Sequence, residues 1–286
     1  MQPIIQAKGI HKVYGNKVAL DKVDLNIPAG RIIGLIGPNG AGKTTLLKGI
    51  LGLAKVDGEL QVMDLNPFTD RVKLLEDVSF IADTAILPQW IRVKEVLEYV
   101  EGVHPKFCRE KTSLFLAKTN IDLNSKVKQL SKGMVTQLHL ALIMAIDSKL
   151  LVLDEPTLGL DIIYRKQFYE SLLNDYYDAD KTVFITTHQV EEIEGILTDL
   201  IFINNGRILL EKPMDEIPTT FYELHVDSFN KEVALALNPI HVRTTLGGFI
   251  MVFEGADRTQ LSLLGKVSTP SVADLFVAKM QPAVAM

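Results

Sequence analysis

The chain contains a single cysteine, Cys108, among its 286 residues, so it cannot form an intramolecular disulfide; that absence suits a reducing compartment. It also lacks a long apolar run. Residues 140–153 are interrupted by polar residues at 147–149 and fall short of the roughly 20 apolar residues that a membrane-spanning helix needs. Residues 1–12 lack a basic start followed by an apolar stretch, so we expect no export signal. We therefore expect a protein that folds around its own core and does not cross a bilayer by itself.

Basic residues are not in excess either: 30 Lys and Arg stand against 35 Asp and Glu, a formal net charge of −5. A general nucleic-acid binder shows a basic stripe, so we expect no nucleic-acid partner. The hydrophobic share of 47%, the charged share of 23% and the 19 Gly and 12 Pro are near the averages of soluble globular chains, which excludes disordered and collagen-like classes. At roughly 150 residues per domain, the length predicts about two domains.

Two kinds of strand pattern occur along the chain. Residues 4–27 alternate between apolar and polar side chains around turns at 14–16 and 28–30, which predicts antiparallel strands. Other runs are apolar without interruption, as strands buried on both faces are. These runs cover residues 31–36, 78–82, 150–153 and 182–186. Helical patterns between them, at 44–53, about 93–145 and about 162–176, predict a mostly parallel α/β sheet.

The sequence changes character after Pro213. We predict a large α/β domain over residues 1–213, with a helical subdomain inserted at about 86–145, and a small α+β domain over residues 214–286. The small domain is expected to contain strands at 221–226, 241–245 and 249–253, and a terminal helix at 271–279. A possible Ser271 cap with an acidic residue three positions later supports that helix.

Eight residues between a predicted strand and a predicted helix fit the pattern of Gly, four residues, Gly-Lys, and Ser or Thr. They are Gly37, Pro38, Asn39, Gly40, Ala41, Gly42, Lys43 and Thr44. Glycines let backbone N–H groups turn toward phosphate oxygens, and a helix N-terminus adds partial positive charge. Lys43 would supply charge to the β and γ phosphates, Thr44 a hydroxyl to Mg²⁺, and Thr45 a further donor. The alternative is a glycine-rich turn that contains a lysine by chance.

The apolar run at 150–153 leads into two carboxylates, Asp154 and Glu155. Asp154 can hold Mg²⁺ through water, and Glu155 can orient or deprotonate an attacking water. Two acids at a strand end are by themselves usually a solvated terminus, because loops are polar. The phosphate loop upstream is what favours the catalytic interpretation.

Five segments together resemble, in order and spacing, the ATP-binding subunit of an ABC transporter. They are residues 37–44, 130–134, 150–156, 159–161 and 187–188. The resemblance covers about residues 4–213 and implies a P-loop NTPase core of mixed, mostly parallel sheet with an antiparallel β subdomain and an inserted helical subdomain. It further implies an ATPase that uses ATP and Mg²⁺, transmembrane permease subunits as partners, and a peripheral location on the cytoplasmic face of the cell membrane.

The resemblance also implies a second copy. Residues 130–134, Leu-Ser-Lys-Gly-Met, resemble the family signature, which closes over ATP held by the other subunit. The Ser131 hydroxyl and the Gly133 N–H would reach the γ-phosphate in trans, in a head-to-tail homodimer or a heterodimer with a related ATPase. As a bare pentapeptide, the same residues would be an ordinary helix N-cap.

Three further residues take roles from the resemblance. His188 resembles the family's switch histidine, which touches the γ-phosphate and holds Glu155 and the water in line. Asp161 resembles the acid of the loop that crosses the dimer interface. Tyr14 resembles the aromatic that stacks on adenine; the alternative is an ordinary hairpin tyrosine.

One position departs from the family pattern. A glutamine normally follows the strand after the first helix, where it ligates Mg²⁺, and aligning residues 78–82 with that strand places Asp83 there. The sequence at 92–95 fits the start of the next helix in this register. Gln89 is the rival, but it would shorten the gap to that helix by six residues. A carboxylate can bind Mg²⁺, yet it adds negative charge beside the γ-phosphate, so we expect slow hydrolysis with nucleotide binding preserved.

Two features bear on what the ATPase drives. The helical subdomain resembles the one that forms a groove for a membrane subunit; Leu87 and Trp90 would fit such a groove, but equally could be core. Residues 270–276 resemble the closing helix of export-type ATPases, and the signature with Lys132 and Met134 also resembles export branches. We therefore expect an exporter. The alternatives are a soluble ABC-type ATPase acting as an assembly or regulatory factor, and a subunit that binds ATP but barely hydrolyses it.

Overall fold

A six-stranded sheet forms the centre of the N-terminal part of the structure, a computed structural model that describes residues 3–82 and 87–281. The strand order is β5-β6-β7-β3-β8-β9, with parallel neighbours as far as β8 and an antiparallel β8–β9 hairpin at the edge. The strands are β3 (Ile32–Ile36), β5 (Val78–Ile81), β6 (Leu150–Asp154), β7 (Thr182–Thr187), β8 (Asp199–Asn204) and β9 (Arg207–Pro213). Every residue of β3, β6 and β7 is buried, which explains their uninterrupted apolar runs.

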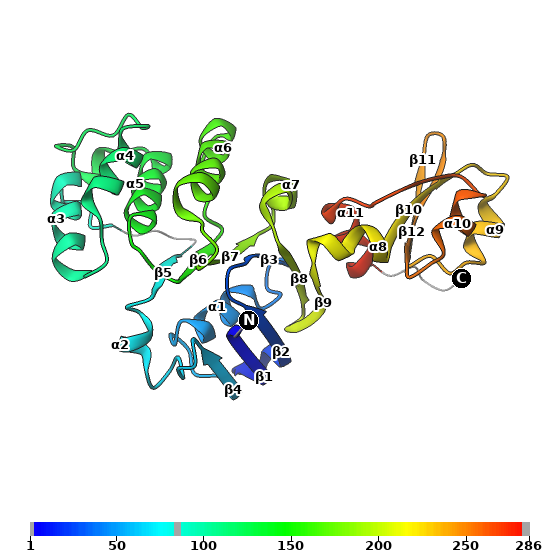
Figure 1. Ribbon diagram of the computed structural model, residues 1–286, viewed down its shortest axis with the longest axis horizontal. Coiled ribbons are helices and arrows are strands. Elements are labelled where there is room, and N and C mark those ends of the chain that lie inside the picture. Colours follow the sequence, from blue (N-terminus) through cyan, green and yellow to red (C-terminus); the bar gives the residue numbers. More distant parts are fainter. Residues whose placement is uncertain (1–2, 83–86, 282–286) are drawn as a thin grey trace.

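An antiparallel sheet of order β2-β1-β4 accompanies the central sheet (Figure 1). Its strands are β1 (Pro3–Tyr14), β2 (Lys17–Pro28) and β4 (Asp57–Val62). Helix α1 (Lys43–Ile50) packs against both sheets, because its Leu46 and Leu47 share one core with Ile5 of β1 and Val152 of β6. The loop between β3 and α1 is therefore held in place from both sides.

The segment between β5 and β6 is helical and has a hydrophobic core of its own. Its helices are α3 (Val93–Val103), α4 (Arg109–Leu116) and α5 (Lys132–Met144), with a 3-10 turn at Val127–Gln129. The Glu95 carboxylate accepts a hydrogen bond from the Arg92 N–H at 2.8 Å and so caps α3. Within the described ranges, 3–82 and 87–281, the helices are all too short or too polar to span a bilayer.

Other short helices connect the strands. Helix α2 (Arg71–Leu74) precedes β5, and α6 (Ile162–Ser171), extended by a π-helical turn at Leu172–Tyr176, lies between β6 and β7. Helix α7 (Val190–Ile193) and a 3-10 turn at Glu194–Ile196 connect β7 to β8. Helix α7 thus begins two residues after His188.

Helix α5 carries a partly buried imidazole, His139, whose buried Nε2 has no hydrogen-bond partner among the described residues. Burial lowers the pKa of His139 to about 4, below the ordinary value of 6.5. Between those two pH values the unfolded chain binds a proton that the folded chain does not, so stability falls as the pH falls. The loss is about 1.4 kcal/mol per pH unit.

We expect the apolar variant His139→Leu to remove this pH dependence. The free energy of unfolding, measured by urea titration at pH 7 and pH 5, should fall by about 2 kcal/mol more in the wild type than in the variant. An equal fall in the two proteins would show that another group carries the acid sensitivity.

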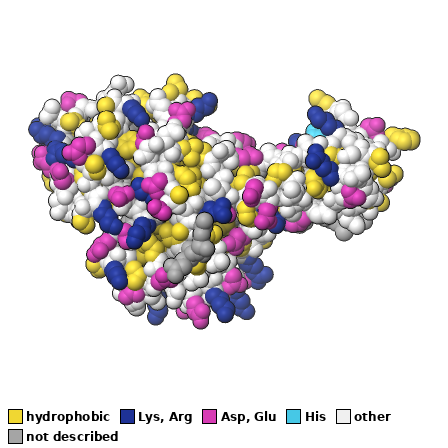
Figure 2. Space-filling view, in the orientation of Figure 1, with side chains coloured by type: hydrophobic (Ala, Val, Ile, Leu, Met, Phe, Trp, Pro, Cys, Tyr) yellow, Lys and Arg dark blue, Asp and Glu magenta, His cyan; other side chains and the backbone are white. Residues whose placement is uncertain are grey.

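Residues after β9 form a four-stranded antiparallel sheet of order β11-β12-β10-β13. The strands are β10 (Phe221–Val226), β11 (His241–Thr245), β12 (Gly248–Glu254) and β13 (Lys266–Ser268). The helices are α8 (Ile217–Thr220), preceded by a 3-10 turn at Met214–Glu216, α9 (Lys231–Leu235), α10 (Arg258–Ser262) and α11 (Val272–Met280). Ala234 of α9 and Leu261 of α10 pack into the core of this sheet. Figure 2 shows a narrow waist between this part and the rest, with charges of both signs interspersed over the visible face.

Helix α11 returns from the C-terminal sheet to the N-terminal part (Figure 1). Its Leu275 belongs to the same hydrophobic core as Ile193 of α7 and Phe202 of β8. The rings of Phe202 and Phe276 meet edge to face, with centroids 5.2 Å apart. The first N–H of α11, at Val272, donates to the Glu194 carboxylate at 3.3 Å. The last helix therefore completes a core that the N-terminal part begins.

The predicted fold class is confirmed: the fold is α/β, with a mixed, mostly parallel sheet and an antiparallel sheet. The four runs predicted to be buried strands are β3, β5, β6 and β7, and the stretch predicted to be mostly helical from 93 to 145 is divided into α3, α4 and α5. Strands β4, β8, β9 and β13 were not predicted. The domain boundary at residue 213 stays a prediction.

Candidate nucleotide site

The loop between β3 and α1 turns sharply at glycines. Gly40 and Gly42 have φ of 80° and 112°, which side chains disfavour. A Cβ on Gly42 would lie 2.5 Å from the Ala19 carbonyl oxygen, so there is also no space for one. The loop therefore passes close to β2 and leads directly into the N-terminus of α1, where backbone N–H groups lack helical partners.

Lys43, the first residue of α1, lies inside this loop. Its Nζ donates to the Gly37 carbonyl oxygen at 2.6 Å and to that of Pro38 at 3.4 Å. Burial lowers the pKa of Lys43, and the carboxylates of Glu155 and Asp154 oppose that shift. A phosphate placed beside the ammonium would favour its charged form in the same way.

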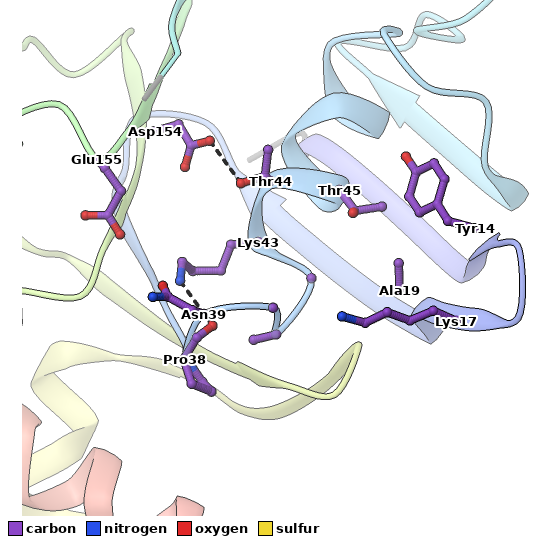
Figure 3. A pocket seen from close by; sticks show the side chains of 13 residues that line it. Tyr14, Lys17, Ala19, Pro38, Asn39, Lys43, Thr44, Thr45, Asp154 and Glu155 are labelled. Atoms are coloured by element: carbon purple, nitrogen blue, oxygen red, sulfur yellow. Dashed lines mark hydrogen bonds between the residues drawn. The ribbon is translucent and has the colours of Figure 1, made fainter. Parts of the chain in front are cut away.

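Thr44 and Asp154 bring a hydroxyl and a carboxylate together from elements far apart in the sequence. The Thr44 hydroxyl donates to Asp154 Oδ2 at 3.1 Å (Figure 3). The Thr186 hydroxyl donates to the other carboxylate oxygen, Oδ1. Asp154 is buried at the end of β6. Oxygen donors of this kind are what Mg²⁺ prefers, so the pair fits the metal that the sequence predicts.

Glu155 and His188 also meet at the ends of neighbouring strands. His188 Nδ1 lies 2.8 Å from Glu155 Oε2, and the two side chains are 50% and 14% exposed. Glu155 has a φ of 49°, a left-handed conformation that is uncommon for a residue with a side chain. Because Nδ1 is engaged with Glu155, Nε2 is the ring nitrogen left to contact a phosphate.

Lys43, Thr44, Asp154 and Glu155 line one open cavity of about 740 Å³, while His188 reaches it only through Glu155 (Figure 3). Its lining residues are Tyr14, Lys17, Ala19, Pro38, Asn39, Gly40, Ala41, Gly42, Lys43, Thr44, Thr45, Asp154 and Glu155. Tyr14 is half-exposed at the β1–β2 hairpin, and the Lys12 ammonium lies 5.2 Å from its ring centroid. The structure thus brings the predicted phosphate-loop, metal, water-activating and adenine-stacking residues into one place.

The sequence analysis did not select Lys17 or Ala19, both on β2. Lys17 pairs with Tyr14 across the hairpin, and its Nζ would lie 3.6 Å from a Cβ on Gly40. The turn predicted at 14–16 was the available signal, because a tight hairpin places its two flanking residues side by side.

Ser131, Gly133 and Asp161 lie outside this cavity. Ser131 is exposed and caps α5 by accepting from the Met134 N–H at 3.2 Å. Asp161 caps α6, accepting from the Ile163 and Tyr164 N–H groups at 3.0 and 3.1 Å. A Cβ on Gly133 would lie 3.5 Å from the Gly159 carbonyl oxygen, so the signature and the 159–161 loop are neighbours. Their action on ATP in a second subunit stays a prediction.

Asp83 lies outside the described residues, so its place at the metal stays a prediction as well. Of the two residues that could line a groove or belong to the core, Trp90 is 71% exposed. Leu87 is partly buried against the helical core. Leu87 therefore belongs in part to the core, and a groove that includes Trp90 stays a prediction.

Similarity to known proteins identifies the family. The family model described as ABC transporter matches residues 20–158. The chain is 31% identical over 272 residues to the Nod factor export ATP-binding protein I of Cupriavidus metallidurans, which covers 88% of this chain and 86% of that protein. This chain belongs to the ABC transporter family of ATP-binding proteins.

Other relatives within the ABC family include a transport protein and an import protein. The bacitracin transport ATP-binding protein of Bacillus licheniformis is 29% identical over 242 residues, covering 82% of this chain and 79% of its own. The sulfate/thiosulfate import ATP-binding protein of Neisseria meningitidis serogroup A is 31% identical over 213 residues, covering 71% of this chain and 60% of its own. The chain is thus an ATP-binding, ATP-hydrolysing subunit of an ABC transporter.

Solved structures share the ABC ATPase fold. An ATP-binding subunit of an ABC transporter aligns with a TM-score of 0.68 at 20% identity, covering 91% of this chain and 98% of its own. A dimeric ATP-binding cassette in a post-hydrolysis state, bound to ADP and phosphate, aligns with a TM-score of 0.63 at 24% identity, covering 73% of this chain and 98% of its own.

Proposed function

We propose that two copies of this ATPase, or one copy and a related ATPase, close head to tail around two MgATP and so drive an export-type ABC transporter. The observation that carries the proposal is the cavity in which Thr44 meets Asp154 and whose Glu155 is contacted by His188 from outside the lining. Each member of that set supplies one part of phosphoryl transfer to water. Ser131 is exposed at the N-terminus of α5, as a donor to ATP held by another subunit must be.

In this proposal the phosphate loop and Lys43 bind the phosphates, and Thr44 and Asp154 hold Mg²⁺, which neutralises developing charge. Glu155 takes the proton of the attacking water, and His188 keeps that carboxylate in line while contacting the γ-phosphate. Tyr14 stacks on the base. Ser131, Gly133 and Asp161 act on the nucleotide of the other subunit.

The share of this chain that each relative covers supports export. The similarity to the Nod factor export protein of Sinorhizobium fredii covers 96% of this chain, while that to the sulfate/thiosulfate import protein covers 71%. The match to this export protein therefore extends beyond the ATPase core into the C-terminal sheet. The alternative function, a soluble assembly or regulatory ATPase, would need none of the membrane contacts described next.

A membrane subunit is supported by exposed apolar side chains near β5. They are Phe68, Val72, Trp90, Tyr99 and Val103, from 52% to 84% exposed, on α2, α3 and the segments beside them. Apolar surface marks a protein interface where such side chains gather into one patch. We propose that they receive a transmembrane permease subunit at the cytoplasmic face of the membrane.

The test is affinity capture from gently solubilised native membranes with Glu155→Gln, which should hold the ATP-closed state. Lys43→Ala, which should not bind ATP, is the control, and Trp90→Glu should lose the membrane partner while keeping ATP binding. We expect one multi-spanning protein with Glu155→Gln alone. Capture of soluble proteins only would favour the assembly-factor function. Accumulation of that permease's cargo inside inverted vesicles would then establish export, whereas loss of preloaded cargo would establish import.

A further inference from the structure

A polar bridge connects the loop after Glu155 to the segment after His188. Arg165, in the first half of α6, donates from Nε to the Leu160 carbonyl oxygen at 2.8 Å. Its terminal Nη1 donates to the side-chain oxygens of Gln189 and Glu192. The Arg165 side chain is only 20% exposed, so water screens these contacts weakly.

The acceptors of this bridge depend on the guanidinium. Glu192 is 27% exposed, its Oε2 is buried without a hydrogen-bond partner, and Arg165 is the cation that the described residues provide for it. Beside it, burial raises the pKa of the Tyr169 phenol, which stays protonated and lies 3.3 Å from the Thr157 hydroxyl. Removing the guanidinium would leave a partly buried carboxylate uncompensated.

The bridge closes a ring that contains the reacting groups. From Glu155 the chain runs to Leu160 through two tight turns, in which the Leu158 N–H donates to Glu155 and the Leu160 N–H to Thr157. Arg165 then links Leu160 to Gln189, the neighbour of His188, and His188 lies 2.8 Å from Glu155. Because the ring is closed, the separation of Glu155 and His188 depends on the shape of the guanidinium fork. A lysine offers one nitrogen and cannot span these acceptors with the same geometry.

We infer that Arg165 is a positioning residue for ATP hydrolysis. It holds the 157–161 loop and the His188 segment at the separation that keeps Glu155 aligned on the attacking water. The inference rests on the hydrolytic roles proposed for Glu155 and His188. Since the 159–161 loop also abuts Gly133 of the signature, the same guanidinium links the site in one subunit to the surface that faces the other.

The test compares Arg165→Met, which keeps the apolar stem, with Arg165→Lys, which keeps the charge opposite Glu192. Misplacing a reacting group by about 1 Å can cost about 100-fold in rate, so we expect kcat for ATP to fall 10- to 100-fold in both variants, with KM within about twofold. Lysine should restore thermal stability but not kcat. Lys166→Met, an exposed neighbour on α6, is the matched control and should change neither.

Single-turnover rates in a Glu155→Gln background separate positioning from folding. If Arg165 acts through Glu155, adding Arg165→Met to Glu155→Gln should slow hydrolysis by less than about twofold further. The inference is overturned if Arg165→Lys restores kcat together with stability, or if Arg165→Met slows the Glu155→Gln protein as much as the wild type. A fully active Glu155→Gln protein would instead overturn the proposed role of Glu155. The effect of Arg165 would then be judged only from kcat of Arg165→Met and Arg165→Lys in the wild-type protein.

Discussion

Glu155→Gln should lower kcat for ATP hydrolysis by about 100- to 10,000-fold, the usual contribution of a general base. Glutamine has the size of glutamate and can still hydrogen-bond His188, but it cannot accept the proton of water. The phosphate loop, Lys43 and the Thr44–Asp154 pair are untouched, so affinity for ATP should change little. Phosphate release measures the first effect, and titration with a fluorescent ATP analogue measures the second.

The matched control is Glu170→Gln, an exposed glutamate on α6 outside the cavity, which should hydrolyse ATP at the wild-type rate. Light scattering should show Glu155→Gln as a stable dimer when ATP is present and not when it is absent. The reason is that hydrolysis no longer opens the closed dimer. A Glu155→Gln protein that turns over ATP within threefold of the wild type would mean that another group activates water.

Removing residues 214–286 should leave the ATPase part unable to fold to a soluble, stable state. Helix α11 covers Ile193, Phe202 and other residues of the core that β7 and β8 help to build. Uncovering that surface forfeits roughly 25 cal/mol for each Å² of apolar area returned to water. We expect a chain that ends at Pro213 to aggregate, measured as the soluble fraction after expression and by sedimentation.

A point substitution measures the same contact in the full chain. Leu275 is fully buried in the shared core, so Leu275→Ala should lower the free energy of unfolding by about 2–5 kcal/mol. Val277→Ala, on the exposed side of α11 at 43% exposure, should lie within about 0.5 kcal/mol of the wild type. Equal urea midpoints for both variants, or a stable chain that ends at Pro213, would show that α11 adds nothing to the ATPase core.

Local signals were sufficient for the phosphate loop and for most buried strands, although the apolar run of β8 was not predicted. Residues 37–44 carry their whole pattern in eight consecutive positions, and buried parallel strands such as β6 appear as continuous apolar runs. Strand β9 is antiparallel at the sheet edge, with mixed burial and charged residues, so its pattern is weak. The same reasoning explains why β4, with exposed residues over its first half, was not predicted.

Contacts between distant segments could not be predicted from the sequence. In the sequence, Arg165 is one charged residue within a predicted helix. Only the fold places its side chain between Leu160 and Gln189. The hydrogen bond from Val272 to Glu194 joins residues 78 positions apart, and no local pattern signals it. Trp90 and Leu87 are similar in polarity and close in sequence, yet packing exposes one and partly buries the other.

The docking of α11 also constrains how the protein is made. Ribosomes add about 5–20 residues per second and domains usually fold as they emerge, but here the core around Phe202 and Ile193 waits for residues 272–280. Throughout the synthesis of the C-terminal sheet, that apolar surface is open to chaperones and to other nascent chains. The newly made ATPase therefore remains prone to aggregation until residues 272–280 have been synthesised and cover this apolar surface.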